Sequence, residues 1–160
     1  VGEGPTVDFT IDGACLNESV QLTNNSQGNI AGYTWNFGDG QSSSDANPIV
    51  NYAAAGNYTI ELQTLGDNGC LSTKSLPHQI YSVPVPNFNT DLPPFSCNGT
   101  PTQFNDLTPP LTDSNINTWQ WSFDDQNASA STQNPQHTYA LSGNYNVSLT
   151  VTSDQLCAAT

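Results

Sequence analysis

The sequence predicts an all-β protein made of two antiparallel β-sandwiches in tandem. Three observations support this fold class. The clearly patterned segments alternate apolar and polar residues with a period of two, and no segment of about ten residues carries the helical period. One pattern is also written twice, about 85 residues apart, which is the length of a small domain rather than of a solenoid unit. Turn-forming Asn, Ser, Thr, Gly and Pro separate the segments, as in sandwich proteins.

The first repeat is expected to run through five strands, in the order VDFTI, SVQLTN, YTWNF, NYTIELQ and a closing strand at residues 79–83. Strict alternation turns one side chain in two toward a core and the other toward water. The inward positions are then Val20, Leu22, Tyr33, Trp35, Phe37, Tyr58, Ile60 and Leu62.

The corresponding strands of the second repeat are expected at PNFNT, PTQFND, TWQWSF and NYNVSLTV. Only Ala158, Ala159 and Thr160 follow Cys157, so this sandwich is expected to lack its last strand, which a neighbouring segment or molecule would supply. The stretch YSVPVPNF joins the repeats, and its prolines favour a short extended spacer. The domains are therefore expected at residues 5–84 and 85–160.

The charge balance excludes two classes of function. The chain has fourteen acidic residues, Lys74 as its one basic residue apart from two histidines, and a net charge of -13. A nucleic-acid-binding protein needs a basic surface, and an anionic membrane surface would repel this chain. No run of about 18 apolar residues predicts a membrane span.

The repeated pattern resembles the PKD domain, an immunoglobulin-like sandwich with a WxFGDG motif followed by a Pro-x-x-x-Tyr-x-x-x-Gly-x-Tyr string. The resemblance covers nearly the whole chain. In the first repeat it is carried by Trp35, Phe37, Gly38, Asp39, Gly40, Pro48, Tyr52, Gly56 and Tyr58. In the second it is carried by Trp121, Phe123, Asp125, Tyr139, Gly143 and Tyr145.

These motif residues are interpreted as structural. The tryptophan would fill the space between the sheets, the Gly-Asp-Gly run would form a tight turn, and the first tyrosine would bond a backbone group at a strand corner. The second repeat has Asp124, Asp125 and Gln126 where the first has Gly38, Asp39 and Gly40. The loss of both glycines predicts a different turn there.

The four cysteines fall one early and one late in each repeat. Metal sites need close cysteine pairs, which are absent from the sequence, so disulfides are favoured over zinc. The matched positions predict the pairs Cys15–Cys70 and Cys97–Cys157, formed in an oxidising compartment. Four buried, reduced thiols are the alternative.

No catalytic set can be named. His78 and His137 occupy unrelated positions of the two repeats, and neither recurs with a nucleophile and an orienting acid. We therefore expect no enzymatic activity and no cofactor. Calcium is kept as an alternative because carboxylates are its ligands, although no calcium-loop spacing occurs. The acidic pool is Asp8, Asp12, Asp39, Asp67, Asp124 and Asp125.

The resemblance implies a non-catalytic repeat module of a large secreted or cell-surface protein, such as the adhesins of Bacteroidetes and gliding bacteria. Its partners would be neighbouring repeats, other copies, or a surface glycan or protein. The alternative is a carbohydrate- or protein-binding accessory module of an extracellular hydrolase. A glycan-binding module should expose a row of aromatic rings, whereas Trp119 aligns with Tyr33 and is expected to be buried.

Overall fold

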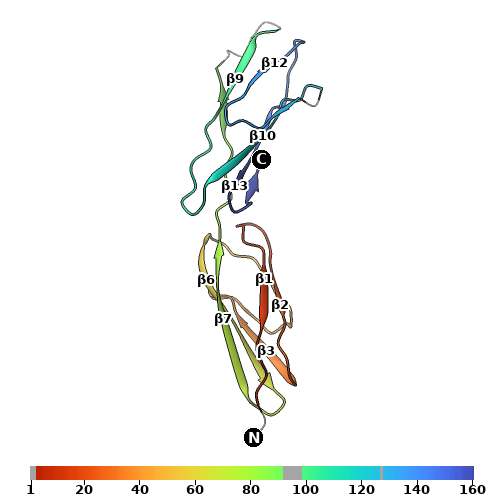
Figure 1. Cartoon of the computed structure of the whole chain (residues 1–160), viewed down its shortest axis with the longest axis vertical. Coiled ribbons are helices and arrows are strands. Elements are labelled where there is room, and N and C mark those ends of the chain that lie inside the picture. The colour runs from red at the N-terminus through yellow and green to blue at the C-terminus, as the bar shows by residue number, and fades with distance from the viewer. Residues whose placement is uncertain (1–2, 92–98, 127) are drawn as a thin grey trace. The chain divides into compact units, whose positions relative to one another are not determined.

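The structure is a computed structural model that describes residues 3–91, 99–126 and 128–160 (Figure 1). It divides into two compact units, Val1–Tyr81 and Ser82–Thr160. The secondary structure of the described residues consists of strands without a helix, and the strands of each unit pair antiparallel in two sheets. The predicted all-β class with two tandem sandwiches is confirmed.

Unit 1 has a three-stranded and a four-stranded sheet. The smaller sheet has the order β1-β2-β5 and the larger one the order β4-β3-β6-β7. The bounds are Phe9–Asp12 for β1, Val20–Asn24 for β2, Ile30–Asn36 for β3, Ser42–Ser43 for β4, Ile49–Val50 for β5, Gly56–Gly66 for β6 and Leu71–Ile80 for β7.

The core of unit 1 lies between these sheets. Its members come from the inward positions of the strands, because a period of two places alternate residues on one face of a strand. Trp35, Ile60 and Leu62 of the larger sheet are fully buried, as are Val20 and Leu22 of the smaller one. The alternation read from the sequence therefore identifies the centre of the core.

Unit 2 repeats this arrangement. Its smaller sheet has the order β12-β9-β8 and its larger sheet the order β11-β10-β13-β14. Trp121, Phe123 and Phe104 are the largest side chains of its core. The bounds are Phe88–Thr90 for β8, Pro101–Asp106 for β9, Ile116–Ser122 for β10, Ser129–Ala130 for β11, Gln136–Thr138 for β12, Ser148–Ser153 for β13 and Ala158–Ala159 for β14.

The units divide between Tyr81 and Ser82, earlier than the expected boundary after residue 84. The reason is a hydrogen-bonded anchor. The backbone N–H and the hydroxyl of Ser82 both donate to the Asp113 carboxylate at 2.8 Å, which fixes Ser82 to unit 2. The valines and prolines that follow therefore lie within the second unit.

The closing strand differs from the prediction. In unit 1 it begins directly after the turn at Cys70 and pairs with β6 along its whole length, from Leu71 to Ile80, rather than starting at residue 79. In unit 2 its counterpart is β14, which pairs with β13 through two residues. The strand predicted for residues 144–151 begins only at Ser148. In unit 1 the corresponding part of β6 pairs with the later half of β7. In unit 2, β14 pairs with β13 only at Val151 and Thr152, so residues 144–147 have no such pairing with it.

Candidate functional sites

The tryptophan of the repeated motif is part of the packing in both units. The indole N–H of Trp35 donates to the carbonyl of Asp45 at 2.9 Å, and that of Trp121 donates to the carbonyl of Thr132 at 3.0 Å. Each ring also receives a phenylalanine edge, from Phe9 in unit 1 at a centroid distance of 5.1 Å. A buried indole whose one polar group already has a partner has no free group to offer a ligand.

The Gly-Asp-Gly run forms the tight turn after β3. Gly38 has φ 82° and Gly40 has φ 94°, values at which a side chain is strained. A Cβ at position 38 would also lie 2.7 Å from the carbonyl oxygen of Thr59. The Asp39 carboxylate accepts the backbone N–H of Gln41 at 2.9 Å, so it holds the turn from within.

The corresponding turn of unit 2 has positive φ without glycine, 59° at Asp124 and 45° at Gln126. It is also one residue longer, because the N–H of Phe37 donates to the carbonyl of Gln41, whereas the N–H of Phe123 donates to the carbonyl of Ala128. Aspartate tolerates the left-handed region when its short side chain bonds locally. Here the Asp124 carboxylate accepts the backbone N–H of Asn146 at 3.0 Å, where the first repeat has the close contact of Gly38 with a strand.

The motif tyrosines differ between the repeats. The hydroxyl of Tyr52 donates to the carbonyl of Phe37 at 3.0 Å, which is a tyrosine-corner bond. The Tyr139 hydroxyl is buried and has no hydrogen-bond partner among the described residues. Burial, followed by the charge of a nearby aspartate, raises the pKa of each of these two tyrosines to about 12. Each ring packs against the next motif tyrosine, Tyr58 at 4.2 Å or Tyr145 at 4.0 Å.

The two motif glycines after these corners lie against aromatic rings. A Cβ on Gly56 would lie 3.9 Å from the ring of Tyr58, and one on Gly143 would lie 3.7 Å from the ring of Tyr145. Ordinary contact distances of this kind indicate close packing rather than a ligand site.

His137 packs as an aromatic side chain. It stacks on Phe123 with a centroid distance of 4.2 Å and meets Tyr139 edge-on at 4.6 Å. Its Nε2 atom lies 2.8 Å from the Asp125 carboxylate. No nucleophile completes this pair among the contacts of the described residues. His78 is far along β7, where Nε2 lies 2.9 Å from the carbonyl of Gly13 and burial lowers its pKa.

The cysteines contradict the predicted pair Cys15–Cys70. Cys15 and Cys157 are each disulfide-bonded, whereas Cys70 is free. The backbone of Cys15 forms an isolated β-bridge with Tyr81 at one end of β7, and Cys70 directly precedes β7 at its other end. Ten strand residues at about 3.3 Å each separate them by roughly 30 Å, whereas the Cα atoms of a disulfide lie within about 7 Å. Cys97 of the second predicted pair lies outside the described residues.

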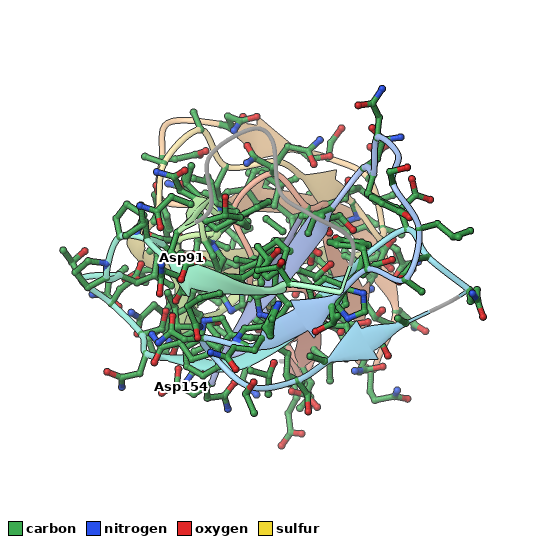
Figure 2. All side chains as sticks on the ribbon, turned by 90° about the horizontal axis from the view of Figure 1, so that it is seen from above. Asp91 and Asp154 are labelled. Carbon is green, nitrogen blue, oxygen red and sulfur yellow. The ribbon has the colours of Figure 1, made fainter. Side chains whose placement is uncertain are left out.

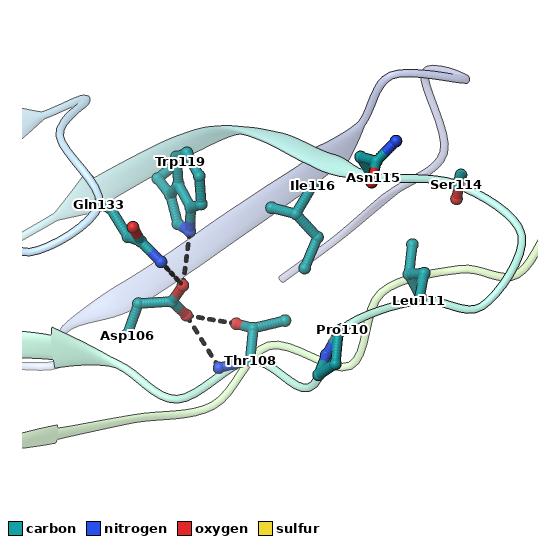
Figure 3. Close-up of a pocket in the computed structure, with 9 residues that line it drawn as sticks. All are labelled: Asp106, Thr108, Pro110, Leu111, Ser114, Asn115, Ile116, Trp119 and Gln133. Carbon is teal, nitrogen blue, oxygen red and sulfur yellow. Dashed lines mark hydrogen bonds between the residues drawn. The ribbon is translucent and has the colours of Figure 1, made fainter.

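One pocket of about 310 Å³ opens on unit 2 (Figure 3). At its wall the Asp106 carboxylate accepts the indole N–H of Trp119 at 2.7 Å and the side-chain amide of Gln133 at 3.1 Å. Its lining residues are Asp106, Thr108, Pro110, Leu111, Ser114, Asn115, Ile116, Trp119 and Gln133. Trp119 is half-buried rather than buried as predicted, because this indole borders the pocket.

Sequence patterns did not indicate this pocket. Asp106 ends one strand and Gln133 follows another, and neither belongs to the repeated motif. Burial acts to raise the pKa of Asp106, but the hydrogen bonds that its carboxylate accepts, led by that of the Thr108 hydroxyl, together lower it. Asp106 and Trp119 lie on strands of different sheets, so no spacing within one strand could have indicated that they meet.

The acidic side chains are dispersed. Among the described residues no three His, Cys, Asp or Glu side chains gather at a distance suited to one metal ion. Asp91 and Asp154, for example, lie at the margin of unit 2 and each accept a backbone N–H, from Gln103 and Asn115 (Figure 2). In unit 1 the Asp8 carboxylate pairs with Lys74 at 2.6 Å, which lowers the pKa of Asp8.

A search of the described residues for helices that are long and apolar enough to cross a bilayer finds none.

Curated relatives match less than half of the chain. The chain is 38% identical over 69 residues to the pre-pro-metalloprotease PrtV of Vibrio cholerae, and 40% identical over 58 residues to the collagenase ColA of Bacillus cereus. These matches cover 43% and 34% of this chain. They cover only 7% and 6% of the relatives, so the chain spans a small part of the curated relatives it matches.

Solved structures are also similar to parts or most of the chain. The PKD1 domain of Vibrio anguillarum Epp is 33% identical with a TM-score of 0.46, covering 49% of this chain and 94% of that one. The fibronectin(III)-like modules of Clostridium thermocellum CbhA are 15% identical with a TM-score of 0.50, covering 98% of this chain and 90% of theirs. The second likeness shows the sandwich fold alone.

The family description "PKD domain" matches twice, over residues 3–80 and 83–160. These spans follow the two units of the structure, and together they take up nearly every residue of the chain. The chain therefore belongs to the PKD domain family and consists of two PKD domains in tandem.

Proposed function

We propose that the chain is a non-catalytic spacer, a pair of PKD repeats that holds other parts of a secreted or cell-surface protein apart. One observation carries the proposal: the repeated residues are used inside the fold. Both motif tryptophans and Tyr52 are buried, and Tyr139 is partly buried with its hydroxyl inside. The motif aspartates bond to turn or core groups. A repeated pattern of this kind specifies a fold, whereas function depends on sites placed on that fold.

The placement of the chain ends within unit 1 suits a spacer. Near its N-terminal end, Thr6 pairs with Gln27, and the Glu3 carbonyl accepts the side chain of Asn68 in the β6–β7 turn. The chain leaves at the opposite end of β7, beside Tyr81 (Figure 1). Tension applied at these ends would load the antiparallel ladder of β6 and β7 along its length.

The test is single-molecule pulling of the full chain in reducing buffer. A spacer should unfold in two separate force peaks, one for each repeat, since each unit has its own core. Extension without measurable force peaks would contradict the proposal, because a module that opens at low tension cannot hold two parts of a protein at a fixed distance.

The finer proposal is that the parent protein is a surface adhesin, in which such repeats carry a binding region away from the cell. The strong acidity, with fourteen carboxylic residues against one lysine, supports an exposed, self-repelling surface. No cofactor enters this proposal, and the expected surroundings are extracellular.

A second candidate is an accessory module that binds a glycan or protein for an extracellular hydrolase. The pocket at Trp119 favours it, because an indole beside a carboxylate and an amide can stack on a sugar ring and bond its hydroxyls. The protease and collagenase relatives point to the same setting.

Glycan-array binding of the full chain distinguishes the candidates. An accessory module should bind, and binding should be lost in Trp119→Ala and in Asp106→Asn. The matched control is Tyr33→Ala, since Tyr33 is the counterpart of Trp119 in unit 1. Binding that survives both pocket variants, or no binding at all, would favour the spacer.

A further inference from the structure

We propose that the pocket of unit 2 binds an arginine side chain presented by a partner protein, with the guanidinium group stacked on the Trp119 ring. The inference rests on the second candidate function, since it names the ligand class of the same pocket. It is independent of the spacer role, because a spacer can carry such a site on its surface.

The pocket lies where the two repeats differ. The backbone N–H of Asn24 and that of Asp106 each donate to the side chain of an asparagine at 2.8 Å, so these two residues are counterparts at the ends of β2 and β9. Unit 1 therefore completes the same strand end with a neutral side chain, and Tyr33 stands there in place of Trp119. Since unit 1 forms its sandwich without this carboxylate and this indole, folding alone does not account for them.

The Asp106 carboxylate is already fully hydrogen-bonded. One of its oxygens accepts the N–H of Thr108 at 2.9 Å and the hydroxyl of the same residue at 2.5 Å. The other accepts the indole N–H of Trp119 at 2.7 Å and the amide of Gln133 at 3.1 Å. A carboxylate has about four acceptor positions, and all are in use. A sugar hydroxyl can bond to it only by displacing one of these donors, whereas a cation needs only its negative charge.

The indole of Trp119 offers a ligand its carbon surface alone. Its N–H points at the Asp106 carboxylate, and a tryptophan side chain has no other polar group (Figure 3). The ring is half-buried and lines the pocket. The face of an indole attracts cations more strongly than that of any other aromatic side chain. Donation of the N–H to a carboxylate polarises the ring further in this direction.

Three carboxylates belong to the pocket or bond to its lining residues, none of which is basic. Besides Asp106, they are Asp113, which accepts the hydroxyl of Ser114 at 3.3 Å, and Asp154, which accepts the side-chain amide of Asn115 at 3.1 Å. Burial acts to raise the pKa of Asp106 and of Asp113, but accepted hydrogen bonds lower both. The bonds from Asn115 lower the pKa of Asp154. All three groups are therefore ionised at neutral pH, and their field attracts a cation.

The size and the polar groups of the pocket favour arginine among cations. Its volume of about 310 Å³ is near the lower end of the range for ligand pockets, which suits a single side chain. The amides of Gln133 and Asn115 donate to carboxylates, and their side-chain oxygens accept no hydrogen bond from the described residues. A guanidinium group is planar, stacks on aromatic faces and brings five N–H donors, whereas the ammonium group of lysine is compact and strongly hydrated.

The test is an NMR titration of the nitrogen-labelled full chain with a blocked Gly-Arg-Gly peptide. The readout is the indole N–H signals of the three tryptophans. We expect a saturable shift of the Trp119 signal, with a Kd in the millimolar range, and no shift of the Trp35 and Trp121 signals. The same peptide with citrulline in place of arginine keeps the planar group and loses its charge. It should bind at least about tenfold more weakly, because the attraction to the ring and to the carboxylates acts on the charge.

Variants locate the site. Trp119→Ala should abolish the response, followed at the backbone N–H signal of Asn115, whereas the matched variant Tyr33→Ala in unit 1 should leave it unchanged. Asp154→Asn removes one charge from an exposed position and should weaken binding severalfold. The comparison of arginine with citrulline uses the unaltered chain, so it decides the matter even if a variant does not fold.

Three results would overturn the proposal, and they differ in what else they affect. Equal binding of the arginine peptide and of its citrulline or lysine analogue would show that the pocket does not select a guanidinium group. Binding of methyl glucoside at Trp119, without binding of the arginine peptide, would leave the accessory-module function intact with a glycan as the ligand. No shift with any of these probes would remove both the arginine site and the accessory function and would leave the spacer function.

Discussion

Replacing Trp35 with alanine should unfold or loosen unit 1 and leave unit 2 unchanged. The side chain is fully buried, and its N–H bonds to the carbonyl of Asp45. Truncating a buried tryptophan costs about 3–5 kcal/mol through lost burial and the cavity left behind. A domain of this size has a total stability of roughly 4–12 kcal/mol, so the substitution removes a large part of it.

The assay is native-state hydrogen exchange of the full chain, read by mass spectrometry. Protection of β6 reports on unit 1 and protection of β13 on unit 2, because these are the central strands of the two larger sheets. In Trp35→Ala the exchange of β6 should accelerate roughly a hundredfold to several thousandfold, at about 1.4 kcal/mol for each factor of ten. In Trp121→Ala the effect should move to β13.

Two further variants serve as controls for the loss of the buried indole. Trp35→Phe keeps most of the buried area and should cost clearly less, so it remains measurable if the alanine variant does not fold. Trp119→Ala should also cost less than Trp121→Ala, since Trp119 is only half-buried. A loss below about 1 kcal/mol in both motif alanine variants would refute the reasoning, because the cores would then not depend on the indoles.

Gly38→Ala should destabilise unit 1 more than Gly40→Ala in a chemical denaturation series, because both positions have positive φ but only a Cβ at position 38 meets backbone within 3 Å; equal losses would show that φ alone decides. Tyr52→Phe should cost about 1 kcal/mol by the same measurement, since it removes a buried hydrogen bond, whereas Tyr139→Phe should be nearly neutral because its hydroxyl has no partner among the described residues; the reverse order would contradict the assignment. The melting temperature should be constant below pH 10 and fall as the pH rises toward 12. The reason is that the folded-state pKa of Tyr52 and of Tyr139 is raised to about 12, so the unfolded chain releases these two protons first. A melting temperature unchanged over that range, or an equally steep fall in the double variant Tyr52→Phe and Tyr139→Phe, would argue against this assignment.

The sequence was sufficient for the fold class and for the cores, since strict alternation fixes which side chains face inward in strands as long as β6 or β10. It was not sufficient for β4, β5, β11 and β12, which have two or three residues each and carry no period. The closing strand was placed too late because four polar residues, Ser72 to Ser75, follow Leu71, so no alternation marks the first half of β7.

The site residues divide in the same way. The repeated glycine, tryptophan and tyrosine positions could be found by comparing the repeats, but the turn at Asp124 could not, because a side-chain hydrogen bond replaces what glycine provides elsewhere. The sequence could not decide how the cysteines pair. Matched positions in two repeats do not show which sulfurs bond, and the structure excludes the predicted pair Cys15–Cys70 because Cys70 is free and β7 separates the two residues.

The turn at Asp124 bears on how such repeats diverge in evolution. Glycine reaches positive φ because it has no Cβ, whereas Asp124 reaches φ 59° with its carboxylate bonded to the backbone N–H of Asn146. A repeat can therefore lose the glycines of its motif and keep its sandwich, provided that a nearby polar side chain takes over their role. Repeats of this kind are then better recognised by their buried tryptophans than by their glycines.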